Sequence, residues 1–268
     1  MPIKGFRLIS IVPYGVGGAE AGAINLIYAK LLYEFGQDFY QVKINQIGEG
    51  TKPDEIIIKG PGNKIHINIR YPAPEDFEAR SVGEKNRYRL DVIHAALNRI
   101  ADHDGKYNKS KLEEIRSKIL LNDFSFQFNI KKFVSPRNKD LIAWIVVEPL
   151  MDRFLYFVVV EYQGKESNKI LIYQSGTVDL YYFKMFFQKG KWKGENELVL
   201  TGKENVVETH VFIKENRVEY VNLTPYEKPP IFEMMKAGIS KEEKEKAHQD
   251  WLHSLPPSHA AIITQALN

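Results

Sequence analysis

The sequence predicts an α+β protein: an antiparallel sheet with helices on one face in the N-terminal half, continuing into an antiparallel β-meander in the C-terminal half. Three observations support this prediction. Apolar residues recur at helical spacing before residue 122, strand-like segments there alternate apolar and polar residues, and strand patterns separated by short turns fill residues 123–225. Strict alternation is typical of strands with one buried and one solvated face, as in antiparallel sheets.

The chain opens with a strand, a helix and a second strand. An apolar strand over residues 6–12 leads through a glycine-rich turn into a helix over residues 20–35. Gly36 is suited to end that helix, because glycine accepts the left-handed conformation common after a helix. Residues 38–47 then alternate apolar and polar side chains, which predicts a half-buried strand.

A hairpin and two helices follow. Residues 55–59 and 64–69 are joined by Gly60-Pro61-Gly62-Asn63, a sequence typical of a tight turn. An apolar stripe over residues 90–100 predicts a helix that ends near Gly105. The next helix is expected to begin at Ser110, because Ser110 and Glu113 fit the spacing of a capping box.

From residue 123 the pattern changes to a meander. Strands are expected over 124–130, 141–147, 154–160, 170–173, 178–187, 197–200, 206–213 and 217–223. Two of these, 141–147 and 154–160, are apolar on both faces and should be central.

The predicted parts are therefore 1–122 (strand, helix, hairpin and two helices), 123–225 (meander) and 226–268 (a tail with short helices). No linker sequence marks the joint, so it stays open whether the parts share one core. Whether the tail docks on the sheet or is a free peptide stays open.

Composition excludes several classes of protein. The chain of 268 residues has a net charge of +3 and no cysteine, so disulfides, thiolate nucleophiles and cysteine metal sites are excluded. So small a charge does not favour nucleic acid. The longest N-terminal apolar run is too short for a signal peptide, and no segment is long enough to span a membrane. We expect a soluble, cytoplasmic protein.

The glycine-rich segment after the first strand resembles a phosphate-binding loop only in part. Gly15 and Gly17 fit a dinucleotide fingerprint, but Glu20 stands where its third glycine should be. Walker spacing requires Lys and Ser or Thr where Ala23 and Ile24 stand. We therefore interpret the segment as a turn of small residues and expect no nucleotide cofactor.

Possible metal ligands also lack parts of their motifs. Asp102, Asp104 and Glu113 match an EF-hand loop, but Lys106 and Tyr107 replace a ligand and the turn glycine.

Neither histidine motif is complete. A metal dyad of His103-Asp104 lacks clear partners besides His94, which we expect at a helix surface or edge. The tail histidines His248 and His253 are five residues apart, not the four that favour a shared helix face, and Pro256-Pro257 separates them from His259. No metal site is predicted.

Carboxylates are harder to exclude as catalytic groups. Glu148, Asp152 and Glu161 flank the two apolar strands, and a buried carboxylate there would have a raised pKa. The sequence does not decide whether they converge.

Aromatic residues and lysines interleave over residues 179–194. If the segment is a strand, Tyr182, Lys184 and Phe186 share its polar face, and Trp192 lies in the adjoining turn. Aromatic residues on such a face are typical of a protein-binding surface. The alternative is that another layer, such as the tail, covers them.

We therefore expect a non-catalytic protein that binds another protein, such as an inhibitor or immunity protein. The alternative is an enzyme that uses strand-borne carboxylates on a nucleotide or nucleic-acid substrate. A nucleic-acid binder built from lysines and aromatic residues ranks below both.

Overall fold

A computed structural model describes residues 9–12, 21–47, 57–151, 153–175, 180–202, 207–222 and 240–254. The chain forms two compact units, the first of residues 1–126 and 149–152 and the second of residues 127–148 and 153–268. The predicted joint at residue 122 lies near the end of the first unit's main segment. The predicted α+β class is confirmed, with helices and a sheet in the first half and a strand meander in the second.

The first unit contains four strands and three α-helices among its described residues. The strands are β1 (Ile9–Val12), β2 (Gln41–Ile47), β3 (Ile57–Gly60) and β4 (Lys64–Arg70). The helices are α1 (Ala21–Glu34), α2 (Val82–Asp104) and α3 (Lys109–Leu121), with a 3₁₀ turn at Phe77–Ala79.

The sheet of this unit is mixed, in the order β1-β2-β4-β3. The hairpin β3–β4 is antiparallel as predicted, but β1–β2 and β2–β4 are parallel. The expectation of purely antiparallel pairing is therefore wrong here. Helix α1 returns the chain to the starting end of the sheet, so β2 runs alongside β1 in the same direction. Alternation in β2 and β4 arises because the helices cover one face only.

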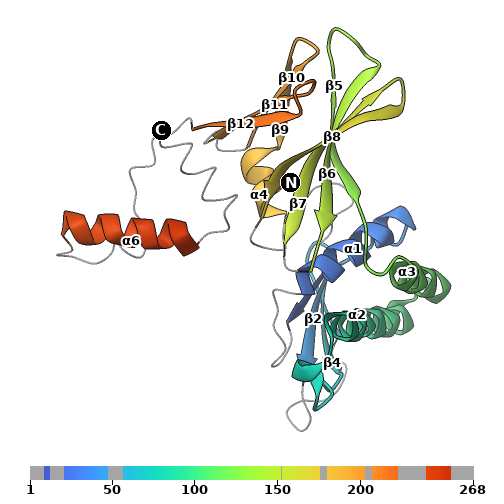
Figure 1. Ribbon diagram of the computed structural model, residues 1–268. Coiled ribbons are helices and arrows are strands. Elements are labelled where there is room, and N and C mark those ends of the chain that lie inside the picture. Colours follow the sequence, from blue (N-terminus) through green and yellow to red (C-terminus); the bar gives the residue numbers. More distant parts are fainter. Residues whose placement is uncertain are drawn as a thin grey trace. The chain divides into compact units, whose positions relative to one another are not determined.

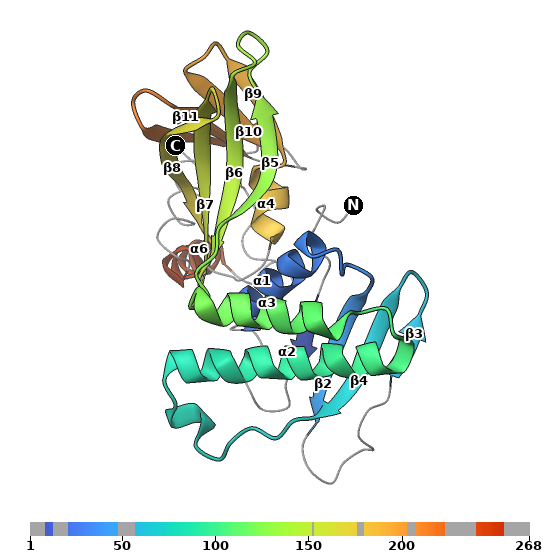
Figure 2. The ribbon, with the colours of Figure 1, turned by 90° about the vertical axis from the view of Figure 1, so that its right-hand side faces the viewer.

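Helices α1, α2 and α3 pack on one another, and α2 and α3 run side by side along the sheet (Figure 2). The strands bury their apolar side chains toward these helices, for example Val42, Ile44, Ile65 and Ile67. None of the helices among the described residues is long and apolar enough to span a membrane.

The ends of the helices follow local rules. Helix α1 ends before Gly36, as predicted, and α2 ends at Gly105. Gly105 has φ 67°, a left-handed conformation that costs other residues about 1 kcal/mol or more. The capping box occurs at Ser81 and Glu84, at the start of α2.

The described residues of the second unit form two four-stranded antiparallel sheets. The first is β5 (Phe128–Val134), β6 (Leu141–Pro149), β7 (Phe154–Tyr162) and β8 (Lys165–Gln174), paired in chain order. The second is β9 (Lys189–Lys193), β10 (Glu197–Thr201), β11 (Val207–Phe212) and β12 (Arg217–Asn222), also in chain order. The helices are α4 (Tyr181–Phe186) and α6 (Lys241–Ser254) (Figure 1).

The two sheets of this unit are in contact at several points. The indole N–H of Trp192 on β9 donates to the Phe133 carbonyl on β5, at 3.2 Å. The hydroxyl of Tyr220 on β12 donates to the Ile172 carbonyl on β8, at 2.5 Å. Gly190 allows the close approach of β9, because a Cβ there would lie 2.8 Å from the Phe133 ring.

Several predicted strands differ from the structure. The strand expected over 170–173 begins at Lys165, and the turn expected to hold Trp192 is strand β9. The strand expected over 124–130 begins only at Phe128, because Asp123 and Phe124 have left-handed backbone conformations that interrupt an extended chain. The strand expected over 178–187 is wrong, because α4 occupies Tyr181–Phe186. As expected, β6 and β7 are the central strands of their sheet.

Candidate functional site

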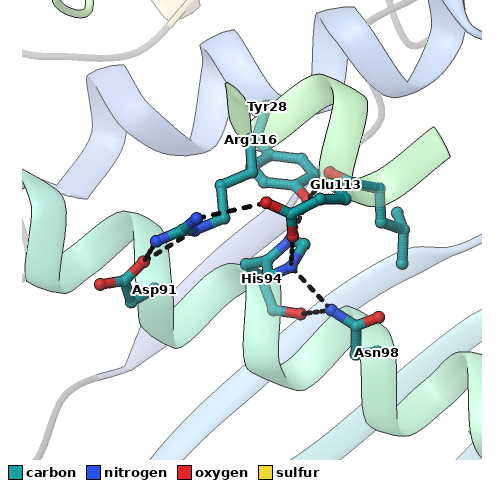
Figure 3. Close-up of polar contacts among 7 residues, drawn as sticks. Tyr28, Asp91, His94, Asn98, Glu113 and Arg116 are labelled. Carbon is teal, nitrogen blue, oxygen red and sulfur yellow. Dashed lines mark hydrogen bonds and ion pairs between the residues drawn. The ribbon is translucent and has the colours of Figure 1, made fainter. Parts of the chain in front are cut away.

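A polar cluster joins the three helices of the first unit around His94 on α2. Its members, which we call the His94 cluster, are Tyr28, Asp91, His94, Asn98, Glu113 and Arg116 (Figure 3).

Both ring nitrogens of His94 have partners. Nδ1 lies 3.0 Å from the hydroxyl of Tyr28 on α1, which also donates to the Leu112 carbonyl on α3, at 3.3 Å. Nε2 lies 2.9 Å from Nδ2 of Asn98 and 3.0 Å from a carboxylate oxygen of Glu113. One imidazole therefore links all three helices.

Nε2 of His94 faces a donor and an acceptor at once. The Asn98 amide, which also donates to the His94 carbonyl at 3.0 Å, lies 2.9 Å away, and the Glu113 carboxylate lies 3.0 Å away. With the proton on Nδ1, the ring donates to the Tyr28 hydroxyl and Nε2 accepts from Asn98. With the proton on Nε2, the ring donates to Glu113 and Nδ1 accepts from Tyr28, so each neutral tautomer satisfies one of the two groups at Nε2.

Burial favours the neutral form of His94. It lowers the pKa of His94 below its ordinary value of 6.5, and the Glu113 carboxylate opposes that shift only in part. Burial also raises the pKa of Tyr28, whose side chain is fully buried, so its hydroxyl stays protonated.

Arg116 completes the cluster at its solvent side. Its guanidinium lies 2.9 Å from Asp91 and 3.3 Å from Glu113. Although burial alone would lower the pKa of Arg116, the bonds and charges of these two carboxylates raise it. Since both ring nitrogens of His94 already have partners, the cluster is arranged to hold helices together rather than to transfer a proton to a ligand.

Glu113 does not form the predicted capping box. Helix α3 begins after Asn108, whose side chain accepts from the Lys111 amide at 3.2 Å, and Ser110 lies within the first turn. Asn108 is favoured as a cap because its short side chain reaches the free amides of the first turn.

The residues of the EF-hand pattern have basic or hydroxyl partners. Asp104 accepts from the Tyr40 hydroxyl and lies 3.1 Å from the Lys59 ammonium, while Asp102 pairs with Lys109. Within the part of the chain that the structure describes, no group of three or more His, Asp or Glu side chains is placed to hold a metal ion.

The other candidate residues are dispersed or lie outside the described residues. Glu148 accepts from Gln127 at 2.8 Å, and Glu161 accepts from the Trp144 indole at 3.0 Å. Asp152, the glycine-rich segment 13–20 and His259 are not among the residues that the structure describes, and the same holds for the side chain of His248. His253 on α6 is exposed.

The predicted protein-binding residues lie on α4 and β9. Phe186 and Trp192 are buried, with 8% and 7% of their surfaces exposed, and Lys184 is exposed. The side chain of Tyr182 lies outside the described residues. Protein binding through these four residues stays a prediction, but two of the aromatic rings pack inside the second unit.

The helical conformation of α4 explains this burial. In a strand, Phe183 and Phe187 would face away from Phe186, whereas in a helix residues three and four apart share one face. Phe186 and Phe187 pack on Tyr173 with ring centroids 5.6 and 5.9 Å apart. All three phenylalanines are therefore core residues.

Aromatic residues do occur on the outer face of the sheet β5-β6-β7-β8, which Figure 2 shows in front. Trp144 on β6 and Phe157 on β7 alternate with fully buried neighbours and are partly exposed. A lysine covers each ring: the Lys132 ammonium lies 5.3 Å from the Trp144 ring, and that of Lys169 lies 4.2 Å from the Phe157 ring.

Apolar residues extend this surface along the neighbouring strands. Val134 on β5 is 46% exposed, Leu171 on β8 is 49% exposed, and Leu155 on β7 is partly exposed. Leu171 lies directly across from Phe157. We call this surface the aromatic sheet face; it comprises Val134, Trp144, Leu155, Phe157 and Leu171. No sequence pattern indicates this surface, because both central strands are apolar throughout.

Comparison of the chain with known protein families, with curated proteins and with solved structures finds no match.

Proposed function

We propose that this protein is non-catalytic and acts by binding another protein through the aromatic sheet face. An inhibitor or immunity protein would belong to this class. The observation that supports the proposal is the combination of Trp144 and Phe157 with the exposed apolar residues Val134 and Leu171 on one antiparallel sheet.

Such a composition is favourable for protein association. Tryptophan, other aromatic residues and contiguous apolar surface are enriched in binding sites, and exposed apolar patches on folded proteins often mark them. The rings of Trp144 and Phe157 are held by neighbouring strands and by their lysines, so little side-chain entropy would be lost when a partner covers them.

The lysines add a polar border that suits a reversible interface. Lys132 and Lys169 lie over the two rings, and Glu148 lies 3.8 Å from Lys169. A polar rim around an apolar centre is the common arrangement of interfaces between proteins that also exist apart.

The proposal can be tested by affinity capture from a lysate of the source organism, followed by reconstitution with the purified partner. Leu171→Asp places a charge on the face directly across from Phe157, and Leu171 is exposed enough to tolerate it. A hot-spot position should lose about 2 kcal/mol of binding free energy, or roughly thirtyfold in Kd, by calorimetry.

Leu121→Asp is the matched control, because Leu121 is an exposed leucine, 88% accessible, at the end of α3 in the other unit. Equal binding by wild type and Leu171→Asp would contradict the proposal. Self-association of the purified protein that Leu171→Asp abolishes would also contradict it, since the face would then bind a second copy of the chain.

A further inference from the structure

The mixed sheet of the first unit has a second face that the helices do not cover. This face lies on the side of β2 and β4 away from α2 and α3 (Figure 1). Its members, which we call the basic sheet face, alternate with the buried residues of the strands: Lys43, Asn45, Ile58, Lys64, His66, Asn68 and Arg70.

The charges on this face have one sign. The described strand residues of this sheet include no Asp or Glu, whereas Lys43, Lys64 and Arg70 are all exposed. Lys43 lies directly across from His66 on the neighbouring strand. A surface that carries charge of one sign attracts ligands of the opposite sign.

Neutral polar groups lie between the charges. The Asn45 amide donates to the Asn68 side-chain oxygen at 2.9 Å, which fixes both side chains across β2 and β4. In this arrangement the Asn68 amide nitrogen is a further donor, and carboxylate oxygens accept bonds from such donors. The row thus combines fixed amides with basic groups on both sides.

An acidic protein segment fits this face better than a nucleic acid does. Single-stranded nucleic acids bind sheets largely by stacking bases on aromatic rings, and the described residues of these four strands include none. Ile58, 57% exposed and directly across from His66, offers instead a contact for an apolar side chain. The net charge of +3 is also small for a protein that binds phosphate backbones.

We propose that the basic sheet face binds an acidic segment of a protein. The inference rests on the proposed function, because it names the chemistry of one part of the partner. It adds a contact site in the first unit that is separate in sequence from the aromatic sheet face of the second.

The test uses the full chain and a labelled peptide of alternating glutamate and valine, with fluorescence anisotropy measured at low and high salt. We expect binding that salt weakens. Lys43→Glu combined with Lys64→Glu should weaken it about tenfold, because each substitution replaces an exposed ion pair with repulsion. Lys165→Glu combined with Lys214→Glu, two exposed lysines of the second unit, changes the net charge equally and should have little effect.

Three outcomes would overturn the inference. They are the absence of peptide binding, equal weakening by both double variants, and tighter binding of a single-stranded oligouridylate that depends on the same two lysines. Circular dichroism must show that each variant is folded. The affinity for the captured partner separates this inference from the proposed function. If the variant with Lys43→Glu and Lys64→Glu binds that partner as tightly as the wild type does, the proposed protein binding stands and the acidic contact is wrong.

Discussion

Replacing Tyr28 with phenylalanine tests whether the His94 cluster stabilises the first unit. The substitution keeps the buried ring but removes the hydroxyl that bonds to His94 and to the Leu112 carbonyl. A buried hydrogen bond contributes about 1 kcal/mol net, and leaving its partners unpaired costs about 1–3 kcal/mol. We therefore expect the free energy of unfolding of this unit to fall by about 2 kcal/mol.

Hydrogen exchange measured by mass spectrometry is the suitable assay, because it reports on α1, α2 and α3 separately. A loss of about 2 kcal/mol corresponds to roughly thirtyfold faster exchange of the most protected amides. Tryptophan fluorescence serves as an internal control, since Trp144, Trp192 and Trp251 all belong to the second unit. Its urea midpoint should remain unchanged if the two units unfold independently.

Tyr33→Phe is the matched variant on the same helix. Tyr33 is only partly buried, and its ring packs under the Lys30 ammonium at 5.2 Å. Loss of its hydroxyl should change stability by less than about 0.5 kcal/mol. The reasoning would be refuted if Tyr28→Phe changed exchange no more than Tyr33→Phe does.

Further predictions follow from single side chains. The pKa of His94 is lower in the folded than in the unfolded chain, so the unfolded chain binds more protons as the pH falls. The first unit should therefore lose stability below pH 6.5. Urea titrations followed by circular dichroism should show that His94→Gln flattens this dependence. Gly190→Ala should cost about 1–3 kcal/mol by urea titration of tryptophan fluorescence, because its Cβ would meet the Phe133 ring; a change below about 0.5 kcal/mol would contradict this. Asn108→Ala should lower the stability of α3, measured by hydrogen exchange, by about 1 kcal/mol, and Ser110→Ala should hardly change it. The reverse order would show that Ser110 is the N-cap residue.

Local sequence patterns predicted much of the first unit. The stripe from Leu90 to Ile100 and the glycine at 105 define α2 because both signals act within a few residues. The β3–β4 hairpin was predicted for the same reason, since its turn lies between its two strands. Parallel pairing of β2 with β1 and β4 could not be predicted this way, because alternation reports which side is buried and not which strand lies alongside.

The candidate sites depended more on packing. The spacing of Ser110 and Glu113 predicts a capping box. In the structure Glu113 lies against His94, because α3 packs beside α2. No sequence motif marks Tyr28, since a tyrosine among apolar helix residues is ordinary, and its bond to His94 joins positions 66 residues apart. No local pattern encodes a contact over such a separation.

Periodicity is a local property of the chain, so the α+β class and the positions of the long helices and central strands can be read from the amino-acid sequence. Which aromatic residues are buried depends on how the elements pack. The six residues of α4 fit a strand or a helix equally well, and packing on Tyr173 selects the helix that buries Phe186. Trp144 lies in a strand apolar on both faces, and it is partly exposed because the second sheet and α4 cover only the opposite face.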